Sequence, residues 1–122
     1  MASLNDEARD QGLDWVITNG TRLDICSTDP GLTYATVTSS TLGNKTLTVG
    51  ATENADSGTG RQVAIPAITD GTVSATGTAS HWALHNGADT VVASGAFSSS
   101  QGVTSGNTFT LDEITVIIRD PA

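Results

Sequence analysis

The two histidines have the most versatile side chains in this sequence, because imidazole can ligate a metal ion or act as a general base. His81 and His85 lie in a segment that alternates polar and apolar residues, which places both on one face of a strand. At ~3.3 Å per residue they lie ~13 Å apart, whereas zinc ligands lie at ~2 Å. The pair cannot chelate one metal ion, although a metal on an oligomer axis could use one of them. The simpler interpretation is two half-exposed polar side chains.

The carboxylates, the cysteine and the serines also do not occur at the spacings that known metal-binding or catalytic motifs require. Glu53 and Asp56 could form part of a weak calcium loop, but the D-x-D-x-D-G pattern is missing, which favours a solvated loop. Cys26 follows Asp24 in an alternating segment, a position typical of a buried small apolar group. No serine occupies a G-x-S-x-G turn. We therefore expect no catalytic, cofactor-binding or metal-binding residues, and no enzymatic activity.

Size and charge narrow the class of protein. The chain has 122 residues and a net charge of −8, which suits a single domain over residues 1–122. Its Lys and Arg residues are dispersed, whereas nucleic acids and anionic membranes attract clustered positive charge. No apolar run approaches the ~20 residues of a transmembrane helix. The acidic N-terminus differs from a signal peptide, and a single cysteine cannot form an internal disulfide. We expect synthesis in a reducing cytoplasm.

The first element that positions these residues is a helix over residues 4–18. Apolar or small residues recur at near-helical spacing from Leu4 to Ile17, and Asn19-Gly20 is a typical helix stop. Trp15 lies on this stripe. Tryptophan is a frequent interface anchor, and packing of Trp15 onto the sheet of its own chain is the open alternative.

Residues 21–118 follow a period of two, with turn signals about every ten residues. This spacing predicts a mainly β fold, an antiparallel β-sandwich or jelly-roll-like domain with one N-terminal α-helix. Asn86-Gly87 predicts a two-residue hairpin turn, and Trp82 alternates with Leu84, which predicts a core position for the indole. Further strands are expected at 33–38, 45–49, 61–65 and 72–78, with a turn at Gly43-Asn44 and a polar loop at 98–107.

The last strand contains a shift in its alternation. Phe109 and Leu111 occupy odd positions, whereas Ile114 and the apolar residues after it occupy even positions. A regular strand cannot direct both sets to one face. We therefore predict a β-bulge or a bend between sheets at Asp112-Glu113, with burial on both faces as the alternative.

Segments at both ends of the chain carry a family resemblance. They are Ala79-Ser-His-Trp-Ala-Leu-His-Asn-Gly87, Val92-Ala-Ser-Gly-Ala-Phe-Ser-Ser-Ser-Gln101, Val103-Thr-Ser-Gly-Asn-Thr-Phe-Thr-Leu111 and Ile118-Arg-Asp-Pro121. The opening, residues 4–17 followed by Arg22-Leu-Asp-Ile25, belongs with them. Together these segments resemble small virion proteins of tailed bacteriophages and prophages, which share an N-terminal helix leading into a thread of short strands.

The resemblance implies a structural component of the virion, made in the bacterial host cytoplasm. Within that class it favours a head decoration or cement protein at the capsid surface. Its partners would be the major capsid protein and copies of itself, commonly as a homotrimer. The acidic charge agrees with an outer surface that touches no DNA. We expect the partner contacts around Leu4, Leu13, Trp15 and Val16, with the polar loops at 53–60 and 98–107 as a second surface.

Two rival functions remain open. One is a tail, neck or fibre-associated virion protein, since nothing in the sequence separates head from tail. The other is a carbohydrate-binding β-sandwich module, which would need exposed aromatic residues or a calcium site. Trp82 and Tyr34 are the aromatic residues that could serve such a module, and the alternation of Trp82 with Leu84 favours a core position instead.

Overall fold

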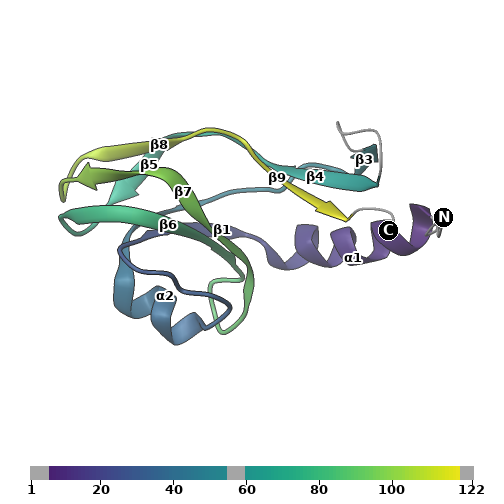
Figure 1. Cartoon of the computed structure of the whole chain (residues 1–122), viewed down its shortest axis with the longest axis horizontal. Helices are drawn as coiled ribbons and strands as arrows, with labels where there is room; N and C mark the ends of the chain where they lie inside the picture. The colour runs from purple at the N-terminus through teal and green to yellow at the C-terminus, as the bar shows by residue number, and fades with distance from the viewer. Residues whose placement is uncertain (1–5, 55–59, 119–122) are drawn as a thin grey trace.

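The computed structural model describes residues 6–54 and 60–118, and this part of the chain is mainly β (Figure 1). The helices are α1 (Asp6–Asn19) and α2 (Tyr34–Ser40). The strands are β1 (Arg22–Cys26), β2 (Thr41–Thr46), β3 (Glu53–Asn54), β4 (Arg61–Ile65), β5 (Ile68–Val73), β6 (Gly77–His85), β7 (Val91–Val103), β8 (Thr108–Leu111) and β9 (Ile114–Ile118). The predicted mainly β fold with an N-terminal helix is confirmed.

Antiparallel pairing arranges the described strands in two sheets. The large sheet has the order β7-β6-β1-β2-β5-β8, and the small sheet has the order β3-β4-β9. Figure 1 shows the large sheet curling, so that β5 and β8 lie over β6 and β7. The sheet thereby supplies two layers by itself, and its first and last strands, β7 and β8, remain its edges.

A two-stranded ribbon connects the sheets. β4 pairs with β9 in the small sheet, and β5 pairs with β8 in the large sheet. The chain passes from β4 to β5 through Pro66-Ala67, and from β8 to β9 through Asp112-Glu113. Proline cannot donate a ladder hydrogen bond, which agrees with a break at this point. The phase shift predicted at Asp112-Glu113 is therefore confirmed as a bend between two sheets.

The N-terminal helix packs against the small sheet. α1 contacts β4 and β9, and the predicted helix at 4–18 is confirmed over the residues that the structure describes. A Cβ added at Gly12 would lie 2.9 Å from Ile118 Cδ1, so the glycine permits the helix to approach β9 closely. The helix ends where Gly20 N–H donates to Val16 O at 2.7 Å and Asn19 Nδ2 donates to Trp15 O at 2.9 Å.

The segment predicted as a strand at 33–38 is instead the short helix α2, so that prediction is wrong. Its hydroxyl groups donate back into the helix, as Ser40 Oγ does to Thr36 O at 2.6 Å. Val37 is 1% exposed and packs with Cys26 on the sheet. Seven residues are too short to reveal a helical period. Burial of Val37, rather than intrinsic propensity, selects the helix here.

Other predicted boundaries also move. β2 runs straight through Gly43-Asn44, so no turn lies there, and the strand ends at Thr46 rather than continuing to Val49. The predicted strand at 72–78 is divided, because β5 ends at Val73 and β6 begins at Gly77. The predicted loop at 98–107 is wrong over its first half, since β7 continues to Val103. The strand at 61–65 is confirmed as β4.

The connection after β6 is longer than a two-residue turn. β6 ends at His85 and β7 begins at Val91. Asn86 Oδ1 accepts hydrogen bonds from three backbone N–H groups that follow it in the chain. The donors are Ala88, Asp89 and Thr90, at 2.9, 3.0 and 3.1 Å. The asparagine side chain thus takes the place of a backbone acceptor. Gly87 has a positive φ of 78°, whereas Asn86 does not, which excludes the predicted two-residue geometry.

The central strands β1 and β6 have two buried faces of different character. The face inside the curl, called here the concave face, carries Leu23, Ile25, Trp82 and Leu84. The opposite face, called here the helix-covered face, carries Asp24, Cys26, Ala83 and His85 under α2 and Tyr34. Alternation along each strand separates the two sets.

Candidate functional site

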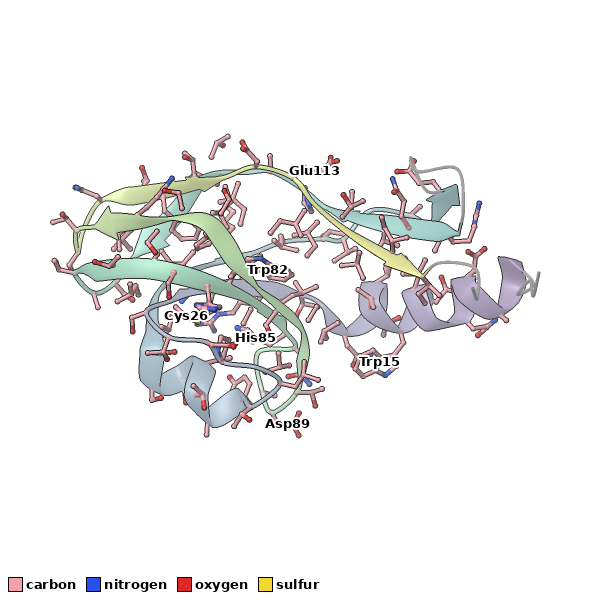
Figure 2. All side chains as sticks on the ribbon, viewed as in Figure 1. Trp15, Cys26, Trp82, His85, Asp89 and Glu113 are labelled. Carbon is pink, nitrogen blue, oxygen red and sulfur yellow. The ribbon has the colours of Figure 1, made fainter. Side chains whose placement is uncertain are left out.

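The outer side of α1 presents the most exposed aromatic side chain that the structure describes. Trp15 is 50% exposed, and Figure 2 shows it pointing away from the sheets. Packing of Trp15 onto the sheet of its own chain is therefore not observed. Its neighbour Leu13 is fully buried in the core, and Val16 is half-buried against that core. Leu4 lies outside the described residues. The predicted partner-binding residues thus divide between an inner side that anchors the helix and an outer side that carries Trp15.

An ion pair fixes α1 to the small sheet. Arg61 Nε on β4 lies 2.8 Å from Asp10 Oδ1, and Arg61 Nη2 lies 3.3 Å from Asp10 Oδ2. Both side chains are partly buried, so solvent screens this contact less than it would a fully exposed pair. Together with Leu13 and Gly12, this contact holds α1 in a defined orientation. The exposed indole of Trp15 therefore lies on a helix that is fixed to the small sheet.

A second candidate is a buried polar cluster on the helix-covered face (Figure 2). His85 is 1% exposed, and its Nε2 lies 2.8 Å from Asp24 Oδ1. Arg22 Nε lies 3.4 Å from the same oxygen, close enough for charge attraction. Tyr34 of α2 meets the His85 ring edge-on, with centroids 5.4 Å apart. The expectation that His85 is half-exposed is wrong, because α2 covers it.

The hydrogen bonds of His85 assign its tautomer. Gly87 N–H donates to Nδ1 at 3.0 Å, so Nδ1 is an acceptor and carries no proton. Nε2 therefore carries the proton and donates it to Asp24. Both ring nitrogens are satisfied within the protein. An aspartate–histidine pair resembles part of a catalytic arrangement, but this imidazole has no nitrogen left to accept a proton from a substrate. The cluster is a structural network.

Cys26 belongs to the same face. It is fully buried, and burial raises the pKa of its thiol, with the Asp24 carboxylate acting in the same direction and a hydrogen bond with Ser40 opposing them. A thiol is a nucleophile only when it is ionised. The geometry therefore agrees with the interpretation of Cys26 as a buried apolar group.

The other side chains considered as metal ligands are His81, Glu53 and Asp56. His81 is half-buried, and its Nδ1 hydrogen-bonds to Ser80 Oγ at 2.8 Å. Glu53 Oε1 accepts from Gln62 Nε2 at 3.0 Å, whereas Asp56 lies outside the described residues. No group of three or more His, Cys, Asp and Glu side chains gathers in residues 6–54 and 60–118. None of the helices described is long and apolar enough to cross a membrane.

The concave face contains a pocket of about 490 Å³. Its lining comes from β1, β5, β6, β7, β8 and the start of β9, together with Ala67 and the bend at Asp112-Glu113. Two aromatic rings shape it, each lying across a glycine that is its direct partner on the neighbouring strand. Trp82 lies over Gly95, and Phe109 lies over Gly71. A Cβ at either glycine would collide with the ring, so these glycines provide the space.

Trp82 packs against the core, as predicted, and also lines this pocket. Tyr34 lies on the opposite face of β1 and β6, beside His85. The two aromatic residues considered for carbohydrate binding therefore share no surface.

Sequence reasoning missed both the Asp24–His85 contact and the pocket. The polar character of the helix-covered face was visible in the alternation, but the pairing of β1 with β6 across 61 residues was not. Comparison with protein-family models, curated proteins and solved structures found no match for this chain.

Proposed function

We propose that this protein is a structural component of a bacteriophage virion, a decoration or cement protein that binds the outside of the head. Each copy would bridge neighbouring major capsid subunits, with further contacts to copies of itself in a trimer. The added binding free energy would oppose expansion of the head by packaged DNA. The sequence resemblance provides the class of protein, and the acidic charge suits a surface that does not face DNA.

The observation that carries this proposal is the exposed Trp15 on the outer side of a firmly anchored helix. An exposed tryptophan contributes no core packing, yet it is the residue type most enriched among interface anchors. Because the inner side of α1 is held by Leu13 and by the Asp10–Arg61 ion pair, docking through Trp15 requires little ordering of the helix. Burial of the indole against a capsid subunit would add about 2 kcal/mol.

The test is co-sedimentation of the purified protein with mature capsids that lack it, after the oligomeric state of the free protein has been measured. We expect saturable binding at a fixed ratio to the major capsid protein, and greater resistance of the loaded capsids to heat. Absence of binding to heads would contradict the proposal, and the same assay with tails would then follow.

A matched pair of variants tests the docking surface. Trp15→Ala should weaken capsid binding at least about ten-fold, as loss of an interface anchor does. Leu32→Ala is the control, because Leu32 is 71% exposed and lies in the loop between β1 and α2. Both variants should remain folded, since neither side chain belongs to the core. Equal losses would show that general surface hydrophobicity, rather than the α1 surface, mediates binding.

A further inference from the structure

The pocket on the concave face lies between two strand edges. β7 and β8 are the first and last strands of the large sheet, and both contribute residues to the pocket lining. In the described part of the chain, β7 pairs only with β6 and β8 only with β5. The large sheet is thus curled but not closed, with β7 and β8 as its two open edges (Figure 1).

Strand edges recognise one kind of ligand through the backbone. An edge strand presents unpaired N–H and C=O groups at the spacing of another strand. β7 has 13 residues, with an irregular stretch between Ala96 and Gln101, and β8 provides a shorter edge of four residues. A small molecule cannot use such a row of groups along its length. An extended polypeptide can.

The lining of the pocket indicates which side chains this polypeptide carries. Ile25, Trp82 and Phe109 provide apolar surface, and the remaining lining includes polar residues such as Ser98 and Gln101. Successive side chains of a strand point to opposite sides. A strand lying in the gap would therefore direct every second side chain towards the apolar residues of the pocket and the others to solvent.

Charge distinguishes a foreign segment from a second copy of this chain. Asp112 and Glu113 are exposed at the bend where the pocket ends, and the lining contains no Lys, Arg or His. Elsewhere in the described residues, cations of this chain already pair with its own acids, as in Arg22–Asp24, Lys45–Asp70 and Arg61–Asp10. A second copy of the chain, with the same net charge of −8, is a poor electrostatic match for this acidic end of the pocket. The complementary occupant is a basic segment of another protein.

We propose that the gap between β7 and β8 binds an extended segment of a partner protein by strand addition. In this segment apolar side chains alternate with polar ones, and a Lys or Arg at one end meets Asp112 and Glu113. The inference does not rest on the proposed capsid function, because it uses a different surface from that of Trp15.

Trp82 provides a direct readout, because its indole lines the pocket. Trp15→Phe leaves Trp82 as the only tryptophan in the chain. The probe is a synthetic peptide of alternating valine and threonine with one terminal lysine, made in two forms with the lysine at either end. It is titrated into the variant at concentrations at which the free peptide is monomeric. We expect saturable change in the Trp82 emission with one of the two peptides, together with added strand signal in circular dichroism.

Two matched controls separate strand addition from nonspecific apolar binding. The same peptide with N-methyl groups on alternate amides keeps its side chains but loses the hydrogen-bond donors along one of its two edges. It is made in two forms, methylated at the odd or at the even positions. One of the two forms should bind at least about ten-fold more weakly than the unmethylated peptide. Asp112→Asn with Glu113→Gln should weaken binding of the lysine peptide about five-fold at low salt. Asp112→Lys with Glu113→Lys should reverse the preference, so that a peptide ending in glutamate binds more tightly than one ending in lysine.

These positions are exposed, so the charge variants should fold. Equal binding of methylated and unmethylated peptides would overturn strand addition. Unchanged Trp82 emission with all peptides, up to the highest concentration at which they are monomeric, would overturn the site itself. Self-association of the protein that is blocked by Asp112→Lys would assign the gap to a second copy and overturn the foreign partner.

Discussion

The two faces of β1 and β6 are both buried, yet they bury different chemistry. The helix-covered face carries Asp24 and His85, and each polar atom of the imidazole has a partner inside the protein. The concave face is apolar, but the sheet curls over it without filling it, and a pocket of about 490 Å³ remains. The helix-covered face is thus closed, because its polar atoms are satisfied inside the protein. The concave face is open, because a pocket remains beside its apolar side chains.

The difference arises from what covers each face. α2 and Tyr34 lie directly on the polar face, because Val37 packs there beside Cys26. The concave face shares its core with Leu13 of α1 and Val63 of β4, and its remaining cover is the continuation of its own sheet through β5 and β8. A sheet that curls without closing leaves its edges and part of its interior available. Internal hydrogen bonds therefore specify the structure on one side, and the other side remains available for a partner.

The largest effect is expected from His85→Ala on the closed face. The substitution leaves the buried Asp24 without its hydrogen-bond donor and opens a void beside Tyr34. We expect the free energy of unfolding to fall by about 3 kcal/mol, as measured by urea denaturation. His81→Ala is the control, since His81 is half-buried, and should cost less than about 1 kcal/mol. Equal costs would contradict the structural role of the network.

Gly43→Ala tests the curl that forms the open face. A Cβ at Gly43 would overlap the Thr72 carbonyl oxygen on β5, so the backbones of β2 and β5 would have to separate. We expect a loss of about 2 kcal/mol in urea denaturation, as for other overpacked sites. Gly102→Ala on β7 is the matched control, because nothing lies within 4 Å of its added Cβ. A cost at Gly102 equal to that at Gly43 would contradict the close approach of β2 and β5 as the cause of the loss.

Alkaline pH should weaken the closed face through Cys26. Burial raises the pKa of the folded thiol, so the thiol ionises first in the unfolded chain. Its contribution to stability is present below the ordinary thiol pKa of about 8.5 and is lost as the pH rises through the folded pKa, at up to about 1.4 kcal/mol per pH unit. The difference between wild type and Cys26→Ala in urea denaturation at pH 7 and pH 10 measures it. A difference that is constant with pH would contradict the burial of the thiol.

The smallest effect is expected at Asp89, in the exposed loop beyond the closed face. Hydrogen bonds from Asn86 and Thr90 lower the pKa of Asp89. Its contribution is therefore present above the ordinary aspartate pKa of about 3.9 and is lost as the pH falls through the lower folded pKa. Asp89→Asn should remove this acid dependence. Two-dimensional NMR of the loop amides from pH 6 to pH 2 measures it, with the Asp70→Asn variant as the control.

Prediction from the sequence succeeded where a pattern extends over many residues. The helix over 4–18, the strand at 61–65 and the bend at Asp112-Glu113 were all readable from periodicity, because each element buries one face. It failed where a short segment is selected by its neighbours. α2 is too short to display a period, and the connection after His85 depends on the side chain of Asn86 rather than on turn type.

The candidate sites follow the same division. Leu13, Trp15 and Val16 were identified from the helical stripe, but their burial was not, because the outer and inner sides of α1 are defined only by contact with β4 and β9. His85 was identified as a residue of interest, but its partner Asp24 lies 61 residues away in the chain. Local sequence carries no information about which distant strand will lie beside a given strand.

The amino-acid sequence by itself determined the mainly β class, the N-terminal helix, the acidic charge and the alternation that divides β1 and β6 into a polar and an apolar face. These properties follow from composition and from periods of two or 3.6 residues, which act locally. Strand order, the curl of the large sheet, and the closure of one face but not the other were decided only by the tertiary structure. They depend on contacts between segments far apart in the chain, as where β5 meets β2 beside Gly43 and where Trp82 lies over Gly95.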